Sequence, residues 1–258
     1  MRLTSAILLA VLVTGPMAAA QESLRSSPDR DNALPHYKQG WDALRAESWA
    51  EAVHEFRLAI ELDRTFTLAY YGLGRSQMGL KRFGDAIAAY EACRQRYQAA
   101  ASQKFQNAQE ADRLRQTDLD QIRIAINALS ASSQGQQASQ ATQNQIRQLR
   151  DQAQRIQLKR DAINNNLSIA SEAPAFVRVA LGSAYFRSER MADAEREYKA
   201  ALEQDAKAGE AWNNLAVVYL MTERYDEAEQ SLKAAEKAGY KVNPNLKDEI
   251  NRKKRGGG

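Results

Sequence analysis

Residues 212–235 read WNNLAVVYLMTERYDEAEQSLKAA. Apolar and small side chains recur through this stretch at steps of three and four residues, which is the spacing of one face of a helix. The phrase ERYDEA at 223–228 separates the first run from the second. The stretch therefore predicts two helices joined by a short turn.

The same outline recurs at an interval of 34 residues. A small residue at a helix crossing lets two backbones approach closely, and a larger side chain fills the space beside it. Neither helix can then bury its face alone, so we expect the copies to stack on one another. The matching sets are Gly40, Ala52, Phe56 and Ala59; Gly74, Ala86, Tyr90 and Cys93; Gly182, Ala194, Tyr198 and Ala201; and Ala216, Ala228, Leu232 and Ala235.

This 34-residue period of helix, turn and helix resembles the tetratricopeptide repeat (TPR) family. The best copy places Trp212, Leu215, Ala216, Tyr219, Ala228 and Ala235 at family positions. The first copy departs from the pattern, with His36 at the family's Trp position and Gln39 at its Leu position. The resemblance implies an all-α fold, a four-repeat α-solenoid of an exported bacterial type, with repeats 1–2 in 33–93 and repeats 3–4 in 174–242. A composition rich in good helix formers agrees with it.

Residues 94–173 separate the second copy from the third. The helices on either side of this insertion would be antiparallel neighbours in the stack. We therefore expect an inserted antiparallel coiled-coil helical hairpin that turns near 130–140, around Gly135, and projects about 50 Å from the body. A disordered Gln-rich linker is the alternative. Heptad-like steps are formed by Leu119, Ile122, Ile126 and Leu129, and by Ile146, Leu149, Ala153, Ile156, Arg160, Ile163, Leu167 and Ala170.

The two ends of the chain carry further patterns. Arg2, an apolar run over 6–13 and small residues up to Ala20 have the layout of a secretory signal peptide in 1–20. Cleavage near Ala20 would give an exported protein, periplasmic or secreted, with no transmembrane segment in the mature chain. We expect 21–32 to be a disordered leader and 243–258 to form a C-terminal cap helix and tail.

The sequence contains no recognisable catalytic or metal-binding motif. Its only histidines, His36 and His54, and its only cysteine, Cys93, are not spaced as metal ligands. No phosphate-binding loop or nucleophile elbow is present, so we predict neither an enzyme nor a cofactor. The net charge of +4 is small and the charges are interspersed, which argues against nucleic acid binding. Cys93, at a crossing position, is expected to be buried.

The resemblance implies a concave groove lined by the first helix of each repeat, and so a protein or peptide partner. We expect an interaction scaffold or adaptor of the periplasm or cell envelope, holding a partner peptide or helix. The alternatives are a structural coiled-coil homo-oligomer, formed through the hairpin, and an accessory or chaperone-like subunit of an exported enzyme. The expected groove residues are Tyr37, Trp41, Arg45, Tyr71, Arg75, Met78, Ser183, Arg187, Asn213 and Asn214.

Overall fold

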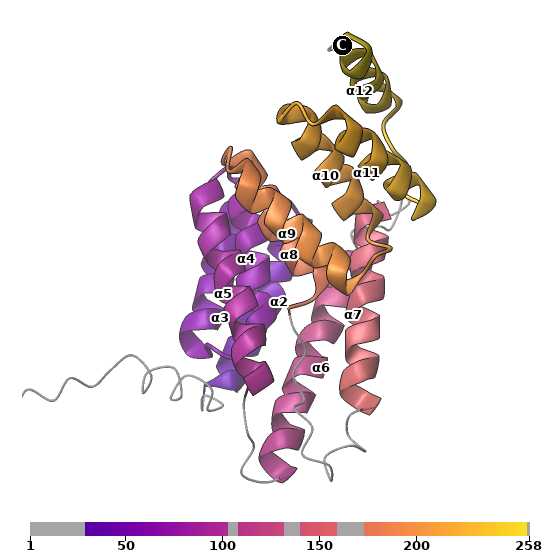
Figure 1. The fold of residues 1–258 in the computed structure, drawn as a ribbon. Helices are drawn as coiled ribbons and strands as arrows, with labels where there is room; N and C mark the ends of the chain where they lie inside the picture. The colour runs from indigo at the N-terminus through magenta and orange to yellow at the C-terminus, as the bar shows by residue number, and fades with distance from the viewer. Residues whose placement is uncertain (1–28, 103–107, 132–139, 159–172, 257–258) are drawn as a thin grey trace, which may run out of the picture.

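The chain folds into an all-α solenoid (Figure 1). The computed structural model describes residues 29–102, 108–131, 140–158 and 173–256, so the expected signal peptide lies outside the described residues. No helix in these ranges is long and apolar enough to cross a membrane. The helices are α2 (Arg30–Arg45), α3 (Trp49–Leu62), α4 (Thr67–Gly79), α5 (Phe83–Ser102), α6 (Ala108–Ala131), α7 (Gln140–Leu158), α8 (Ala175–Arg187), α9 (Met191–Gln204), α10 (Gly209–Met221), α11 (Tyr225–Lys237) and α12 (Pro244–Gly256).

Four helix pairs, α2–α3, α4–α5, α8–α9 and α10–α11, share one turn geometry. Each turn contains a single non-glycine residue in the left-handed region, at Glu47, Lys81, Glu189 and Glu223, with φ between 57° and 61°. The next residue donates a backbone hydrogen bond to the carbonyl five positions earlier, as Arg82 does to Gln77 at 2.9 Å. This closure satisfies carbonyls that the end of the first helix leaves without partners. The 34-residue spacing in the sequence is thus repeated in the backbone.

The helix crossings are closed by aromatic rings lying against glycines, as expected. Phe56 is fully buried, and its ring lies against both Gly40 and Gly72. Tyr90 lies in the same way against Gly74, and Tyr198 against Gly182. Cys93 occupies the corresponding crossing in α5, fully buried, and burial raises the pKa of its thiol well above the ordinary value. The thiol is therefore a small packing group.

The stack continues directly from α5 to α8, although 103–174 lies between them in sequence. Glu197 of α9 is 2% exposed and accepts hydrogen bonds from Arg94 of α5 and from Arg178 of α8, the latter at 3.4 Å. The Tyr185 hydroxyl of α8 donates to Glu91 of α5. A charged, hydrogen-bonded cluster therefore joins the two halves of the array.

The helix boundary at the N-terminal end differs slightly from expectation. Helix α2 begins at Arg30, inside the stretch expected to be a disordered leader, because the Arg30 side chain binds Asp63 at 2.9 Å and Thr65 at 2.6 Å. At the other end, α12 packs on α11 and buries Ile250 at 1% exposure.

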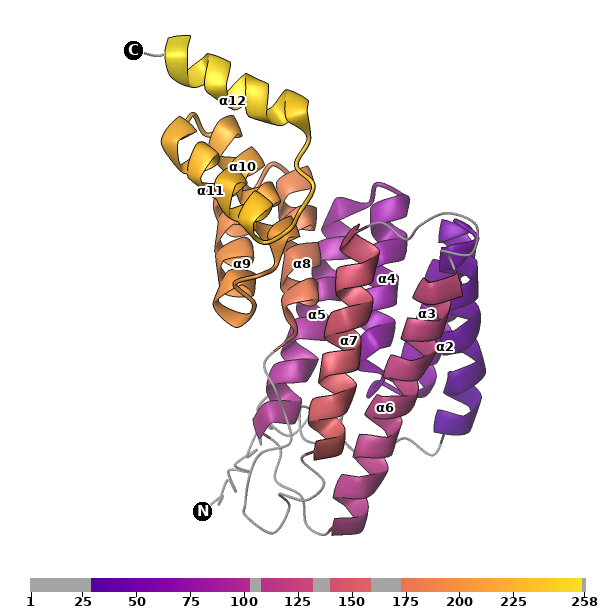
Figure 2. The same ribbon diagram turned by 90° about the vertical axis from the view of Figure 1, so that its right-hand side faces the viewer.

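The insertion does not project as two long arms. Helix α5 ends at Ser102, and α6 begins at Ala108 and packs against α2 and α4 (Figure 2). Helix α7 lies beside α6 and also contacts α8. The expectation of a 50 Å projection was wrong because α6 has a second packing face besides the one it offers to α7. The reversal expected near 130–140 falls between α6 and α7, largely outside the described residues.

Gly72→Ala tests the tight crossing. A Cβ at this position would lie 2.3 Å from Phe56 Cζ, and the ring cannot move away because Gly40 holds its other side. We expect a loss of about 1–3 kcal/mol in the free energy of unfolding, measured by urea titration. Gly84→Ala, where a Cβ meets nothing within 4 Å, is the matched control and should be neutral or stabilising. Equal effects at both positions would contradict this account.

Candidate functional site

The inner face of the solenoid is formed by the first helix of each pair, α2, α4, α8 and α10. In this structure the insertion covers much of that face. The Tyr37 hydroxyl of α2 donates to the Gln121 carbonyl of α6 at 3.0 Å, and the Leu68 amide of α4 donates to Gln121 Oε1 at 3.2 Å. Inner surface that we expected to be open in the first two repeats is thus packed against α6.

Helix α7 covers the neighbouring part of the inner face through amide side chains. Gln145 donates to the Tyr71 hydroxyl of α4 at 3.0 Å. Gln148 accepts a hydrogen bond from the Phe176 amide at the start of α8, at 2.9 Å, and donates to Asp205 at 3.2 Å. These contacts seat α7 beside α4 and α8.

The predicted groove residues therefore divide into two groups. Tyr37 is 0% exposed, Trp41 2% and Tyr71 5%, so these three aromatic side chains belong to the core, and Trp41 and Tyr71 reach the surface only where they line hollows. The physical reason is that α6 and α7 lie over α2 and α4. The other predicted residues are partly or fully exposed: Arg45, Arg75, Met78, Ser183, Arg187, Asn213 and Asn214.

Several of the accessible residues already have partners within the chain. Arg45 pairs with Asp42 at 3.1 Å, and the Arg187 guanidinium lies 4.8 Å from the centre of the Phe83 ring. Ser183 is hydrogen-bonded to Tyr198, and Asn214 donates to Ser183 at 3.5 Å. Ser183 and Asn214 thus belong to the polar surface of α8 and α10.

One hollow on the inner face is a cleft of about 290 Å³ between α4, α7, α8 and α10. Arg75 is the one charged residue of the predicted groove set that lines this cleft. It lies there beside residues that the sequence analysis did not single out. The cleft is lined by Tyr71, Arg75, Thr142, Asn144, Gln145, Gln148, Phe176, Val179, Ala180, Ala208 and Glu210.

Two opposite charges on the cleft wall, Arg75 and Glu210, are near each other without forming an ion pair within 4 Å. Arg75 Nη1 is buried and has no hydrogen-bond partner in the described part of the chain. Burial raises the pKa of Glu210, and the Arg75 guanidinium partly offsets that rise. A buried guanidinium NH without a partner is costly, so a ligand that supplies an acceptor there gains the hydrogen bond. The cleft is therefore suited to a polar ligand that offers both an acceptor and a donor.

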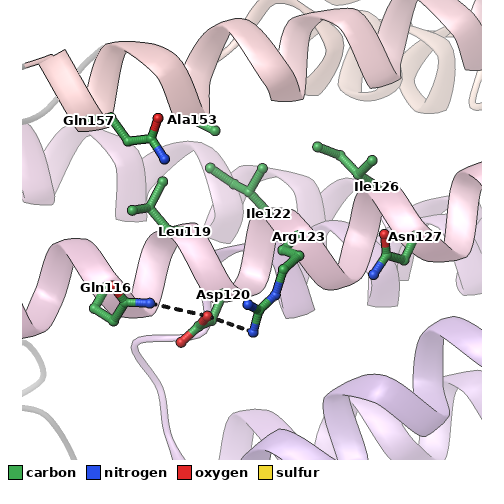
Figure 3. Close-up of a pocket in the computed structure, with 9 residues that line it drawn as sticks. All are labelled: Gln116, Leu119, Asp120, Ile122, Arg123, Ile126, Asn127, Ala153 and Gln157. Carbon is green, nitrogen blue, oxygen red and sulfur yellow. Dashed lines mark hydrogen bonds and ion pairs between the residues drawn. The ribbon is translucent and has the colours of Figure 1, made fainter.

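A second hollow of about 320 Å³ lies between α6 and α7 on the side away from the repeats (Figure 3). Leu119, Ile122 and Ile126 of α6 point toward Ala153 of α7. Polar residues of α6 form its edge, where Asp120 pairs with Arg123 at 2.9 Å. The apolar steps noted in the sequence are therefore the seam between α6 and α7.

Within the described ranges, no group of His, Cys, Asp and Glu residues is arranged to hold a metal ion. The cleft offers one guanidinium, one carboxylate and several amides, which are hydrogen-bonding groups.

Comparison with known proteins agrees with this geometry. Residues 37–101 and 179–241 match the tetratricopeptide repeat family, and these segments, with their paired helices, place the chain in that family. Proteins of this family generally act as protein–protein interaction scaffolds. Comparison with curated protein sequences gives no significant match.

Solved TPR structures are similar to this chain only at low identity. The P58(IPK) TPR domain is 14% identical, with 87% of this chain and 65% of that chain covered and a TM-score of 0.33. YrrB, a TPR protein with an unusual peptide-binding site, is 17% identical, with 92% and 97% covered and a TM-score of 0.29. The TPR2AB domain of yeast Sti1, in a complex with pHSP90, is 13% identical, with 86% and 97% covered and a TM-score of 0.27. Such values carry no inference about ligands.

Asp118→Asn tests how α6 is held. Asp118 lies near Arg30 of α2, and burial raises the pKa of its carboxyl to about 7. The Asp118 carboxyl therefore binds its proton more tightly in the folded protein than in the unfolded chain. Its contribution to the free energy of unfolding decreases as the pH rises toward 7. We expect the substitution to raise the free energy of unfolding more at pH 8 than at pH 5, by at least about 1 kcal/mol. Denaturant titrations at both values measure it.

The control for this prediction is Asp151→Asn, at an exposed position of α7. It should change stability little, and by the same amount at both pH values. A gain from Asp118→Asn that does not depend on pH would contradict the assignment.

Proposed function

We propose that this chain is a non-enzymatic adaptor, a four-repeat TPR array interrupted by a helical hairpin, which holds an extended segment of a partner protein in the Arg75–Glu210 cleft. The observation that carries the proposal is a pair of opposite charges on the wall of one cleft: Arg75, whose buried Nη1 has no hydrogen-bond partner in the described part of the chain, and Glu210, which lies near it without an ion pair. Arg75 would bind a carboxylate or main-chain carbonyl of the partner, and Glu210 an amide or cationic group.

The remaining cleft residues support an extended peptide as the ligand. Asn144 can donate and accept hydrogen bonds, as the alternating amides and carbonyls of a peptide main chain require, while Gln145 and Gln148 hold the wall of the cleft in place through Tyr71, Phe176 and Asp205. Phe176 and Val179 add apolar surface for a side chain.

Arg75→Gln and Glu210→Gln test the cleft directly. Peptides would first be selected from a random displayed library on the wild-type chain, and their Kd values measured by calorimetry. We expect each substitution to weaken the selected peptides about tenfold or more, because a charge-assisted hydrogen bond in a partly buried site is lost.

The matched controls are Arg57→Gln and Glu203→Gln, which remove the same charges from exposed positions of α3 and α9. They should leave the Kd unchanged. If the cleft variants also bind within a factor of two of wild type, the partner lies elsewhere and the proposal fails.

The protein is further proposed to act after export, in the periplasm or outside the cell. The proposal rests on the signal-like layout of residues 1–20. Expression of the full sequence in a bacterial host, followed by fractionation and N-terminal sequencing, should give mature protein in the periplasm or medium beginning at Gln21. Uncleaved protein confined to the cytoplasm would contradict export.

A further inference from the structure

We infer that the inner face of α2 and α4 is a helix-binding groove, and that α6 occupies it in place of a partner helix with the same side-chain pattern. The groove is a different surface from the Arg75–Glu210 cleft, although α7, which packs on α6, also lines the cleft. Helix α6 would then compete with amphipathic helices of partner proteins for the inner face of the first two helix pairs.

The groove already holds one helix, α6, which contacts α2 and α4 along a single face. Thr117, Gln121, Ile124 and Ala128 follow one another at steps of four, three and four residues, which places them on one face of α6. This face points toward α2 and α4: Thr117 accepts a hydrogen bond from Arg30, Gln121 bonds to Leu68 and Tyr37, and Ile124 and Ala128 line a hollow beside Trp41. A different face, with Leu119, Ile122 and Ile126, meets α7.

The occupant fits its groove imperfectly. A hollow of about 230 Å³ remains between α2 and α6, beside Trp41, Ile124 and Ala128. Two buried donors lie at this contact: Gln121 Nε2 has no hydrogen-bond partner in the described part of the chain, and Trp41 Nε1 lies near the Tyr37 hydroxyl without a well-formed hydrogen bond. Each donor left unsatisfied in the protein interior weakens the attachment. A partner helix that filled the hollow and accepted these hydrogen bonds would bind the same surface better.

Helix α6 occupies the groove because it belongs to the same chain as α2 and α4. Helix α6 follows α5 after only residues 103–107, so its local concentration at the groove is high without an optimal fit. Helix α6 contacts α7 through an apolar seam and contacts α2 and α4 largely through hydrogen bonds. Because water can replace those hydrogen bonds more easily than it can replace the apolar seam, we expect α6 and α7 to leave the groove as one unit.

The chemistry of the stripe specifies the partner. A competing helix would carry an amide or hydroxyl side chain at the position of Gln121 and small or aliphatic side chains seven residues later, at the position of Ala128. Lys38 and Arg45 stand at the edge of the hollow beside Asp42. An acidic residue on the partner helix at that edge would therefore be favoured over a basic one.

The test uses the full chain and a labelled synthetic peptide of residues 108–131 as the probe. Ala128→Arg places a bulky cation between α6 and α2, near Lys38 and Arg45, and leaves the groove itself unchanged. We expect the probe to bind this variant at least tenfold more tightly than the wild-type chain, measured by fluorescence anisotropy. Gln116→Arg introduces the same charge on the exposed face of α6 and should leave binding at the wild-type level.

Two further measurements keep the result interpretable. If Ala128→Arg fails to unfold cooperatively, the milder Gln121→Ala, which removes the hydrogen bond to Leu68, should show the same direction of change. Adding Tyr37→Phe to the opened variant should weaken the probe again, because the bond to the α6 main chain is lost. Glu210→Gln should not affect the probe, so failure of the cleft and failure of the groove are distinguishable.

Equal probe affinity for wild type, Ala128→Arg and Gln121→Ala would overturn the inference. So would light scattering that shows the opened variant to be a dimer at the assay concentration, because the groove would then be refilled by a second copy of the chain. Tighter binding by a monomeric opened variant is the supporting result.

Discussion

The architecture depends on close helix crossings at which a ring lies against a backbone that has no side chain. Phe56 is held between Gly40 and Gly72, which belong to different helix pairs, so one side chain closes a crossing within a pair and the contact to the next pair. Tyr90 and Tyr198 lie against Gly74 and Gly182 and close the crossing within their own helix pairs. Because packed interiors tolerate little change in volume, these contacts fix the angle between successive helices. The curvature of the inner face, and therefore the cleft, follows from them.

The repeat could be predicted from the sequence because its determinants are local and periodic. Small residues and rings at fixed positions require a particular approach of two helices, and the turn residues recur at the same interval. Even the left-handed residue of each turn, such as Lys81 or Glu223, falls at the interval of 34. The residues that make the contacts within one repeat, or between two adjacent repeats, all lie within one short window of sequence.

The placement of the insertion could not be predicted in the same way. Its apolar stripe through Leu119, Ile122 and Ile126 was visible and marks the seam with α7. The second face of α6 is made of Thr117, Gln121, Ile124 and Ala128, and a stripe with so few apolar residues resembles a solvated surface in a Gln-rich sequence. Its meaning depends on Tyr37 and Leu68, which are far away in the chain. The cleft was missed for a similar reason, since Arg75, Gln145 and Glu210 come from three distant helices that meet only after α7 has packed.

The direct contact between α5 and α8 has a consequence for folding. Most contacts in a helical repeat protein join neighbours in sequence, which favours rapid folding. Here the array is complete only when the chain closes a loop over residues 103–174, through Glu197 and its two arginines. The entropy of closing a loop grows only slowly with its length, so the equilibrium cost is modest, but the contact must form across a long separation. The helix pairs before the insertion and those after it can thus fold early and separately. The formation of the contact between α5 and α8 is then the step that can delay folding of the whole chain.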